Sequence, residues 1–213
     1  MKINQPTFAF TLNMDERARE GYDNNRWVYV DSYSLEMTHD DAWPINTIYL
    51  VPPEHLLELN DVASMGVQPG ISKVHQESDR DQVLKKRVKW VLARKGDDLS
   101  RILDTGMNIL LHIEDEGELS PQLVDNRLDC TDLIVALSCS SAPTKEILHQ
   151  RVRSIRRILD GGRTAGCQLL ISGSINPYVL FETSKIPGVS GILMFDTTSV
   201  DMVDLLSSIM KKK

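Results

Sequence analysis

Short apolar runs recur along the whole chain, and most of them are followed by a polar turn and then by apolar residues at helical spacing. Uninterrupted apolar runs are typical of strands that are buried on both faces. Because these strands alternate with helices, the pattern predicts an α/β fold with a parallel sheet. The runs cover residues 7–12, 46–51, 88–93, 108–113, 132–137, 168–172 and 190–195, with weaker candidates at 27–33 and 65–71.

The clearest helix signals lie in the last third of the chain. The stretch from Pro143 to Gly162 carries apolar residues at helical spacing and predicts an amphipathic outer helix that stops at the glycines. A short helix before Pro187 and a terminal helix over 199–210 are also expected. Strands and helices in this order fit a closed (β/α)8 barrel or an open doubly wound sheet, and the pattern alone does not choose.

The composition describes an acidic chain of one domain. The 213 residues, 41% of them hydrophobic, suffice for one sizeable core, so we expect a single domain over 1–213. A net charge of −6 and a pI of about 5.4 do not favour nucleic acid as the main partner. The three cysteines have no metal-type spacing, which indicates reduced thiols and no metal site. With no apolar segment of membrane-spanning length and no leader pattern, we expect no membrane insertion and a soluble, cytoplasmic protein.

Several motifs, taken in chain order, resemble one family. They are "TFAFTLNMD", "IYLVPPEHL", "VKWVLARKGDD", "GMNILLHIEDE", "DLIVAL", "LLISGSINP" and "VSGILM". They resemble the first, second, fourth, fifth, sixth, seventh and eighth strands of the triosephosphate isomerase family. The resemblance implies a (β/α)8 TIM barrel whose functional residues lie at the carboxyl ends of the strands.

The family's three catalytic positions are all altered in this sequence. In the family, a Lys, a neutral His and a Glu move a proton between a keto and an aldehyde triose phosphate. The positions that match them here read Asn13, Lys95 and Ser138. The resemblance therefore implies a barrel without catalytic residues, and we expect no cofactor.

The family's phosphate cradle is only half retained. Gly173 and Ser174 match its first turn, whereas Phe195 and Asp196 replace the Gly-Gly pair after the eighth strand. The mobile lid that follows the sixth strand in the family has no counterpart between Ser141 and Pro143. Lost donors and an added carboxylate disfavour an anion, so we expect that phosphate is not held as the family holds it.

The segments that shape the outside of the barrel also differ from the family. The third loop is shortened and charged over 72–82, and because burying such charges is costly, the usual family dimer is not expected. An insertion over 19–44 lies between the first and second strands and is rich in aromatic residues. Four of them form a candidate protein interface, although packing against the barrel is the simpler interpretation: Trp27, Tyr29, Tyr33 and Trp43.

Four other clusters have both a functional and a simpler interpretation. The run from His112 to Glu116 has the residue types of a metal site but favours a solvated acidic loop. A set of arginines favours a solvated helix face over a basic face for RNA or an acidic partner: Arg151, Arg153, Arg156, Arg157 and Arg163. Residues 138–141 contain hydroxyl and thiol nucleophiles with no evident base. Lys95 and Asp196 suggest either an ion pair that plugs the old site or a Schiff-base lysine with a helper.

The altered positions favour a non-catalytic relative of triosephosphate isomerase that serves as a structural or protein-binding subunit of a larger assembly. One alternative is a barrel enzyme with a rebuilt site that uses residues among Lys95, Asp196, Glu114 and Ser138. The other alternative is a very divergent active isomerase.

Overall fold

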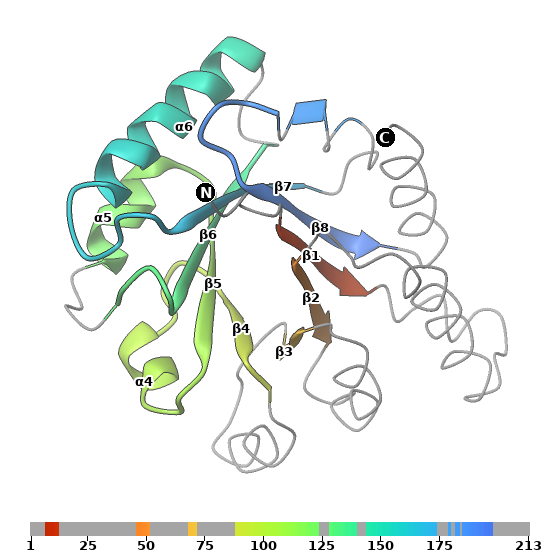
Figure 1. Ribbon diagram of the computed structural model, residues 1–213, viewed down its shortest axis with the longest axis vertical. Helices are drawn as coiled ribbons and strands as arrows, with labels where there is room; N and C mark the ends of the chain where they lie inside the picture. Colours follow the sequence, from red (N-terminus) through yellow and green to blue (C-terminus); the bar gives the residue numbers. More distant parts are fainter. Residues whose placement is uncertain are drawn as a thin grey trace, which may run out of the picture.

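Eight strands run through the chain in the computed structural model, which describes residues 7–12, 46–51, 68–71, 88–123, 128–139, 144–173, 179, 182–183 and 185–197. All of them are parallel to their neighbours (Figure 1). Their bounds are Thr7–Leu12 (β1), Asn46–Val51 (β2), Gln68–Ile71 (β3), Trp90–Ala93 (β4), Asn108–Ile113 (β5), Leu133–Ser138 (β6), Gln168–Gly173 (β7) and Gly191–Thr197 (β8).

The strands pair in sequence order, and the last one returns to the first. Phe8 of β1 pairs with Thr47 of β2 on one side and with Ile192 of β8 on the other. The sheet is therefore a closed barrel in the order β1 to β8, which excludes the open doubly wound alternative. The register between β1 and β8 shifts between Phe10 and Leu12, at the carboxyl end of the barrel.

Helices cover the outer side of β4 to β7 (Figure 1). They are α4 (Leu99–Leu103), the 3₁₀ helix η3 (Glu116–Glu118), α5 (Leu119–Gln122) and α6 (Lys145–Leu159). The Thr144 hydroxyl accepts the backbone N–H of Ile147 and so caps the start of α6. The helix then buries Leu148, Val152, Ile155 and Leu159, which are spaced at three- and four-residue intervals along one face.

Two apolar clusters divide the core. One joins the outward-facing strand residues to α4 and α6, as Val91, Leu111, Val135 and Ile155 illustrate. The other fills the barrel interior with residues that alternate with the first set along each strand: Ile48, Leu50, Trp90, Leu92, Leu110, Ile134, Ala136, Leu170 and Leu193. Strand alternation therefore tells which side chains point into the barrel.

The strands expected at 7–12, 46–51 and 108–113 have these same bounds, and the others shift by only a few residues. The α/β class with a curled parallel sheet is confirmed. The helix expected after Pro143 is confirmed as α6. Three expected features lie outside the described residues: the insertion over 19–44, the strand at 27–33 and the terminal helix. These features stay predictions, and so does a helix after every strand.

Arg156 of α6 ties the helix to the amino-terminal ends of two strands. Its guanidinium donates to the carbonyl oxygens of Gly188 and Cys167, each at 2.6 Å, and to the Ser190 hydroxyl at 3.3 Å. This arginine belongs to the set that the sequence assigned to a solvated helix face. Arg156 is instead partly buried and holds the segments that lead into β7 and β8.

Candidate functional site

The carboxyl ends of β4 to β8 bring five residues to the carboxyl end of the barrel, where Arg94 is exposed and the other four are buried or half-buried. Arg94, His112, Ser138, Ser172 and Phe195 each continue the inward-facing alternation of its strand, two residues after Leu92, Leu110, Ala136, Leu170 and Leu193. The inward-facing residues two positions earlier on these five strands are all apolar. The change from apolar to polar side chains marks this end as the candidate site.

Phe195 contacts two members of this group, His112 and Arg94. Its ring meets the His112 imidazole edge-on, with ring centroids 5.0 Å apart and planes at 89°. The Arg94 guanidinium carbon lies 5.8 Å from the Phe195 centroid, within the range of a cation–π contact. Phe195 is half-buried and packs against the interior cluster, so an aromatic ring stands where the barrel opens.

His112 is 8% exposed, and its Nε2 atom is fully buried with no hydrogen-bond partner among the described residues. Burial lowers the pKa of His112 from its ordinary value because it disfavours the charged imidazolium. Arg94 lowers this pKa further, whereas Glu114 and Glu118 oppose the shift. The imidazole is therefore neutral near pH 7, with a nitrogen available to donate or accept a proton.

Two serines complete the polar end of the interior. Ser138 is buried at the end of β6, and Ser172 is buried at 0% exposure in β7, directly across the ladder from it. The Ser172 hydroxyl is the second buried polar group that finds no partner within the described ranges. Next to Ser138, burial raises the pKa of the half-buried Cys139 thiol, which keeps it protonated and does not favour a nucleophile there.

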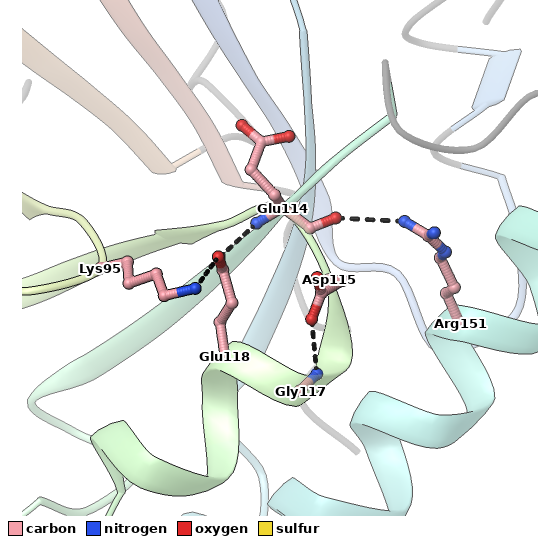
Figure 2. A network of polar contacts seen from close by, with 6 residues as sticks. All are labelled: Lys95, Glu114, Asp115, Gly117, Glu118 and Arg151. Carbon is pink, nitrogen blue, oxygen red and sulfur yellow. Dashed lines mark hydrogen bonds and ion pairs between the residues drawn. The ribbon is translucent and has the colours of Figure 1, made fainter.

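Lys95 does not join this group. Its ammonium nitrogen lies 3.1 Å from Glu118 Oε1, and its side chain is 72% exposed (Figure 2). This exposure contradicts a buried Lys95 that plugs the barrel. Its pairing with Asp196 stays a prediction, because the Asp196 side chain lies outside the described residues. The physical reason for the exposure is alternation: Arg94 follows Leu92 on the inward face, and the turn after it carries Lys95 outward.

Glu118 organises the turn that follows β5. Its other carboxylate oxygen accepts the backbone N–H of Glu114 at 2.9 Å. From the opposite side, the Arg151 guanidinium of α6 donates to the Glu114 carbonyl oxygen at 3.1 Å. Figure 2 shows the Glu114 side chain pointing away from both contacts. The backbone of Glu114 is thus held between two elements, which fixes where β5 ends.

The acidic run after β5 is built as a turn. The Asp115 carboxylate accepts the backbone N–H of Gly117 at 2.8 Å and caps η3, as Figure 2 shows. The Glu116 carboxylate oxygen Oε2 lies 4.0 Å from Arg151 Nε. In the part of the chain that is described, no three His, Cys, Asp or Glu side chains gather as a metal-binding group.

The comparisons with known proteins bear on the fold. No protein-family model matches the chain, and no curated protein matches it in sequence. Among solved structures, the chain is similar to triosephosphate isomerase from Bartonella henselae, with a TM-score of 0.71 and 14% sequence identity over 97% of this chain and 99% of that chain. The chain has a triosephosphate isomerase-like fold. At this identity the likeness shows the fold alone.

The triosephosphate isomerase-like fold accounts for the places of the described positions that the resemblance singled out. Ser138 and Gly173 end β6 and β7, and Phe195 lies near the end of β8, all at the carboxyl side of the sheet. Lys95 follows β4 but points outward. For Asp196, the structure describes only the backbone in β8. The remaining predicted residues lie outside the described ones: Asn13, Ser174, Trp27, Tyr29, Tyr33 and Trp43.

Arg94, the inward direction of His112 and the pairing of Ser138 with Ser172 were not found from the sequence. The turn after β4 resembles the family's turn at Lys95, which hides the role of the residue before it. The usable signal is strand alternation, because Trp90 and Leu92 place Arg94 on the inner face, and Leu110 does the same for His112.

No described helix of this triosephosphate isomerase-like fold is long and apolar enough to cross a membrane.

Proposed function

We propose that the chain is a non-catalytic protein with a triosephosphate isomerase-like (β/α)8 barrel, shortened loops and an aromatic-rich insertion between its first two strands. It serves as a structural or protein-binding subunit of a larger assembly. The altered catalytic positions Asn13, Lys95 and Ser138 support this proposal. The Lys95 ammonium is also engaged by Glu118, away from the barrel interior.

One observation carries the proposal, and it concerns the end of β8. The resemblance places a phosphate-gripping Gly-Gly turn at Phe195 and Asp196, but β8 continues through both residues to Thr197. An extended strand does not present the successive converging N–H groups that bind a phosphate. The Phe195 ring also covers the interior beside His112.

Two measurements on the purified chain test the loss of activity. With a triose phosphate as substrate, the rate of isomerisation should equal that of the uncatalysed reaction. A phosphorylated acid that resembles the family's transition state should leave the melting temperature unchanged, because a ligand stabilises only a fold that binds it. Turnover above the solution rate would instead establish the divergent active isomerase.

The assembly itself is tested by the native mass of the chain in an extract of its source cells. We expect it to migrate well above its own mass of 24.0 kDa. Replacing Trp27, Tyr29, Tyr33 and Trp43 together by alanine should return it to that mass, because buried aromatic side chains dominate interface energies. Migration of the unchanged chain at its own mass would contradict a subunit role.

A second candidate function is a barrel enzyme with a rebuilt site, and the buried neutral imidazole of His112 favours it. Its pKa responds to Glu114 and Arg94, so a carboxylate that can move a proton and a guanidinium that supplies positive charge lie within electrostatic range of the imidazole. A metabolite that raises the melting temperature and is turned over by the unchanged chain, but not by His112→Phe, would replace the non-catalytic proposal with this one.

A further inference from the structure

Two buried polar atoms without partners among the described residues occupy one level of the barrel interior. His112 pairs with Ala136, and Ala136 pairs with Leu170. In a barrel of this type, residues at equal height advance by about one position per strand. Two strands on from His112, the residue at the same height is therefore Ser172, two positions after Leu170. His112 and Ser172 thus share one layer, above apolar ones.

This layer requires a hydrogen-bonding partner. A buried polar atom left unpaired costs stability, and nearly all such atoms in folded proteins are paired with protein, water or ligand. His112 Nε2 donates in one tautomer of the neutral ring and accepts in the other, and the Ser172 hydroxyl does either. A hydroxyl oxygen both donates and accepts through a single heavy atom. It therefore satisfies both groups whichever tautomer is present.

The surroundings favour a small and uncharged partner. Charged groups are costly to bury at this depth. The charges that influence His112 from the barrel end have opposite signs, Arg94 from the end of β4 and Glu114 and Glu118 after β5. The Phe195 ring meets the imidazole edge-on with 5.0 Å between the ring centroids, which limits the space beside the imidazole. A partner with a terminal CH₂OH group meets these limits.

We propose that His112 and Ser172 form a binding site for the hydroxyl group of a small uncharged molecule, closed over by Phe195. The alcohol hydroxyl is bound between His112 Nε2 and Ser172 Oγ, and its carbon chain contacts the Phe195 ring. Water offers the same chemistry and is the competing occupant. Phosphate is not required by this site, and the proposal does not depend on whether the protein is catalytic.

Titration of the labelled full-length chain with glycerol tests the proposal. Imidazole nitrogen resonances are followed by NMR at constant pH, and the His112 signals are assigned by their loss in His112→Phe. We expect a saturable shift of the His112 Nε2 resonance. The signals of His149, which also has a buried Nε2 without a described partner but lies on the outer helix α6, should not saturate. Ser172→Ala should weaken the apparent affinity about fivefold, the effect of one hydrogen bond.

The outcomes separate the two occupants. A shift that stays linear and equal for His112 and His149 means that the layer holds water only, which overturns the proposal. The unchanged chain decides this alone, so a variant that fails to fold does not leave the question open. Isomerase turnover would overturn the non-catalytic function and leave the proposed hydroxyl site in place. A titration that does not saturate would overturn the hydroxyl site and leave the non-catalytic function in place.

Discussion

His112 shows how one side chain links stability to pH. In the folded chain, burial lowers its pKa below the ordinary value of about 6.5 that the unfolded chain retains. As the pH falls below that value, the unfolded chain takes up a proton that the folded chain resists. Stability is therefore full above about pH 6.5 and is lost progressively below it, down to the folded pKa.

The measurement is the melting temperature between pH 8 and pH 5. We expect a steeper acid loss for the unchanged chain than for His112→Phe, which keeps a ring in the layer but cannot be protonated. Ser172→Ala is the matched control, because it alters the same layer and retains the imidazole, and it should keep the steeper loss. Identical pH profiles for the unchanged chain and His112→Phe would mean that His112 is not buried as a neutral group.

At the residue scale, the sequence predicted part of the candidate site. Gly173, Ser138 and Phe195 were correctly placed near strand ends because strand ends follow from the apolar runs. The direction of Lys95 was missed, since it depends on where the turn after β4 begins and on its contact with Glu118. A sequence comparison supplies neither. His112 was assigned to an acidic loop because its acidic neighbours dominate the composition of 112–116.

At the scale of elements, the turn between β5 and α5 depends on one carboxylate. Glu118, whose side chain is 11% exposed, accepts the Glu114 N–H and pairs with Lys95. Glu118→Ala removes both contacts and should lower the free energy of unfolding by about 1–2 kcal/mol, because the Glu114 N–H loses a charged acceptor. Lys95→Met removes only the exposed ion pair and should cost less than about 1 kcal/mol. Urea denaturation of both variants measures the difference. Equal losses would show that the ion pair, and not the backbone contact, holds the turn.

Strand β3 illustrates why one element was harder to predict than the others. Its sequence, QPGI, contains a proline and a glycine, both of which disfavour strands, so only a weak strand was expected there. The closed barrel explains the glycine. A Cβ atom on Gly70 would lie 2.6 Å from Leu50 Cδ2 and 3.1 Å from the Trp90 Cβ, so glycine makes room for these two interior side chains.

Gly70→Ala should therefore destabilise the barrel by about 1–3 kcal/mol through overpacking of the interior. Gly162→Ala is the matched control, because a Cβ there meets nothing within 4 Å. The urea midpoint should fall for the first variant and stay nearly constant for the second. A neutral Gly70→Ala would mean that Leu50 can turn aside without cost.

At the scale of the whole molecule, the α/β class with a parallel sheet was predictable from the apolar runs and their order. The resemblance to the triosephosphate isomerase family, and not the pattern itself, favoured closure of that sheet over an open one. Function was not predictable to the same depth. Many chemistries share this barrel, and what distinguishes them is a few side chains at the strand ends. The side chains at the strand ends of this chain include Arg94, His112, Ser172 and Phe195, and of these four only Phe195 matches a position to which the resemblance gives a function.

The last prediction concerns the oligomeric state of the isolated chain. The segment over 72–82, which would form the family's interlocking dimer contact, is short and rich in charged residues, and it lies outside the described part of the structure. Burying several charges without matched partners costs more than such a contact returns. Sedimentation equilibrium of the purified chain should therefore give a monomer of 24.0 kDa. A mass twice this value would contradict the prediction. If Asp79→Ala and Asp81→Ala leave that dimer intact, the chain dimerises through another surface. If they disrupt it, the chain uses the family's contact after all.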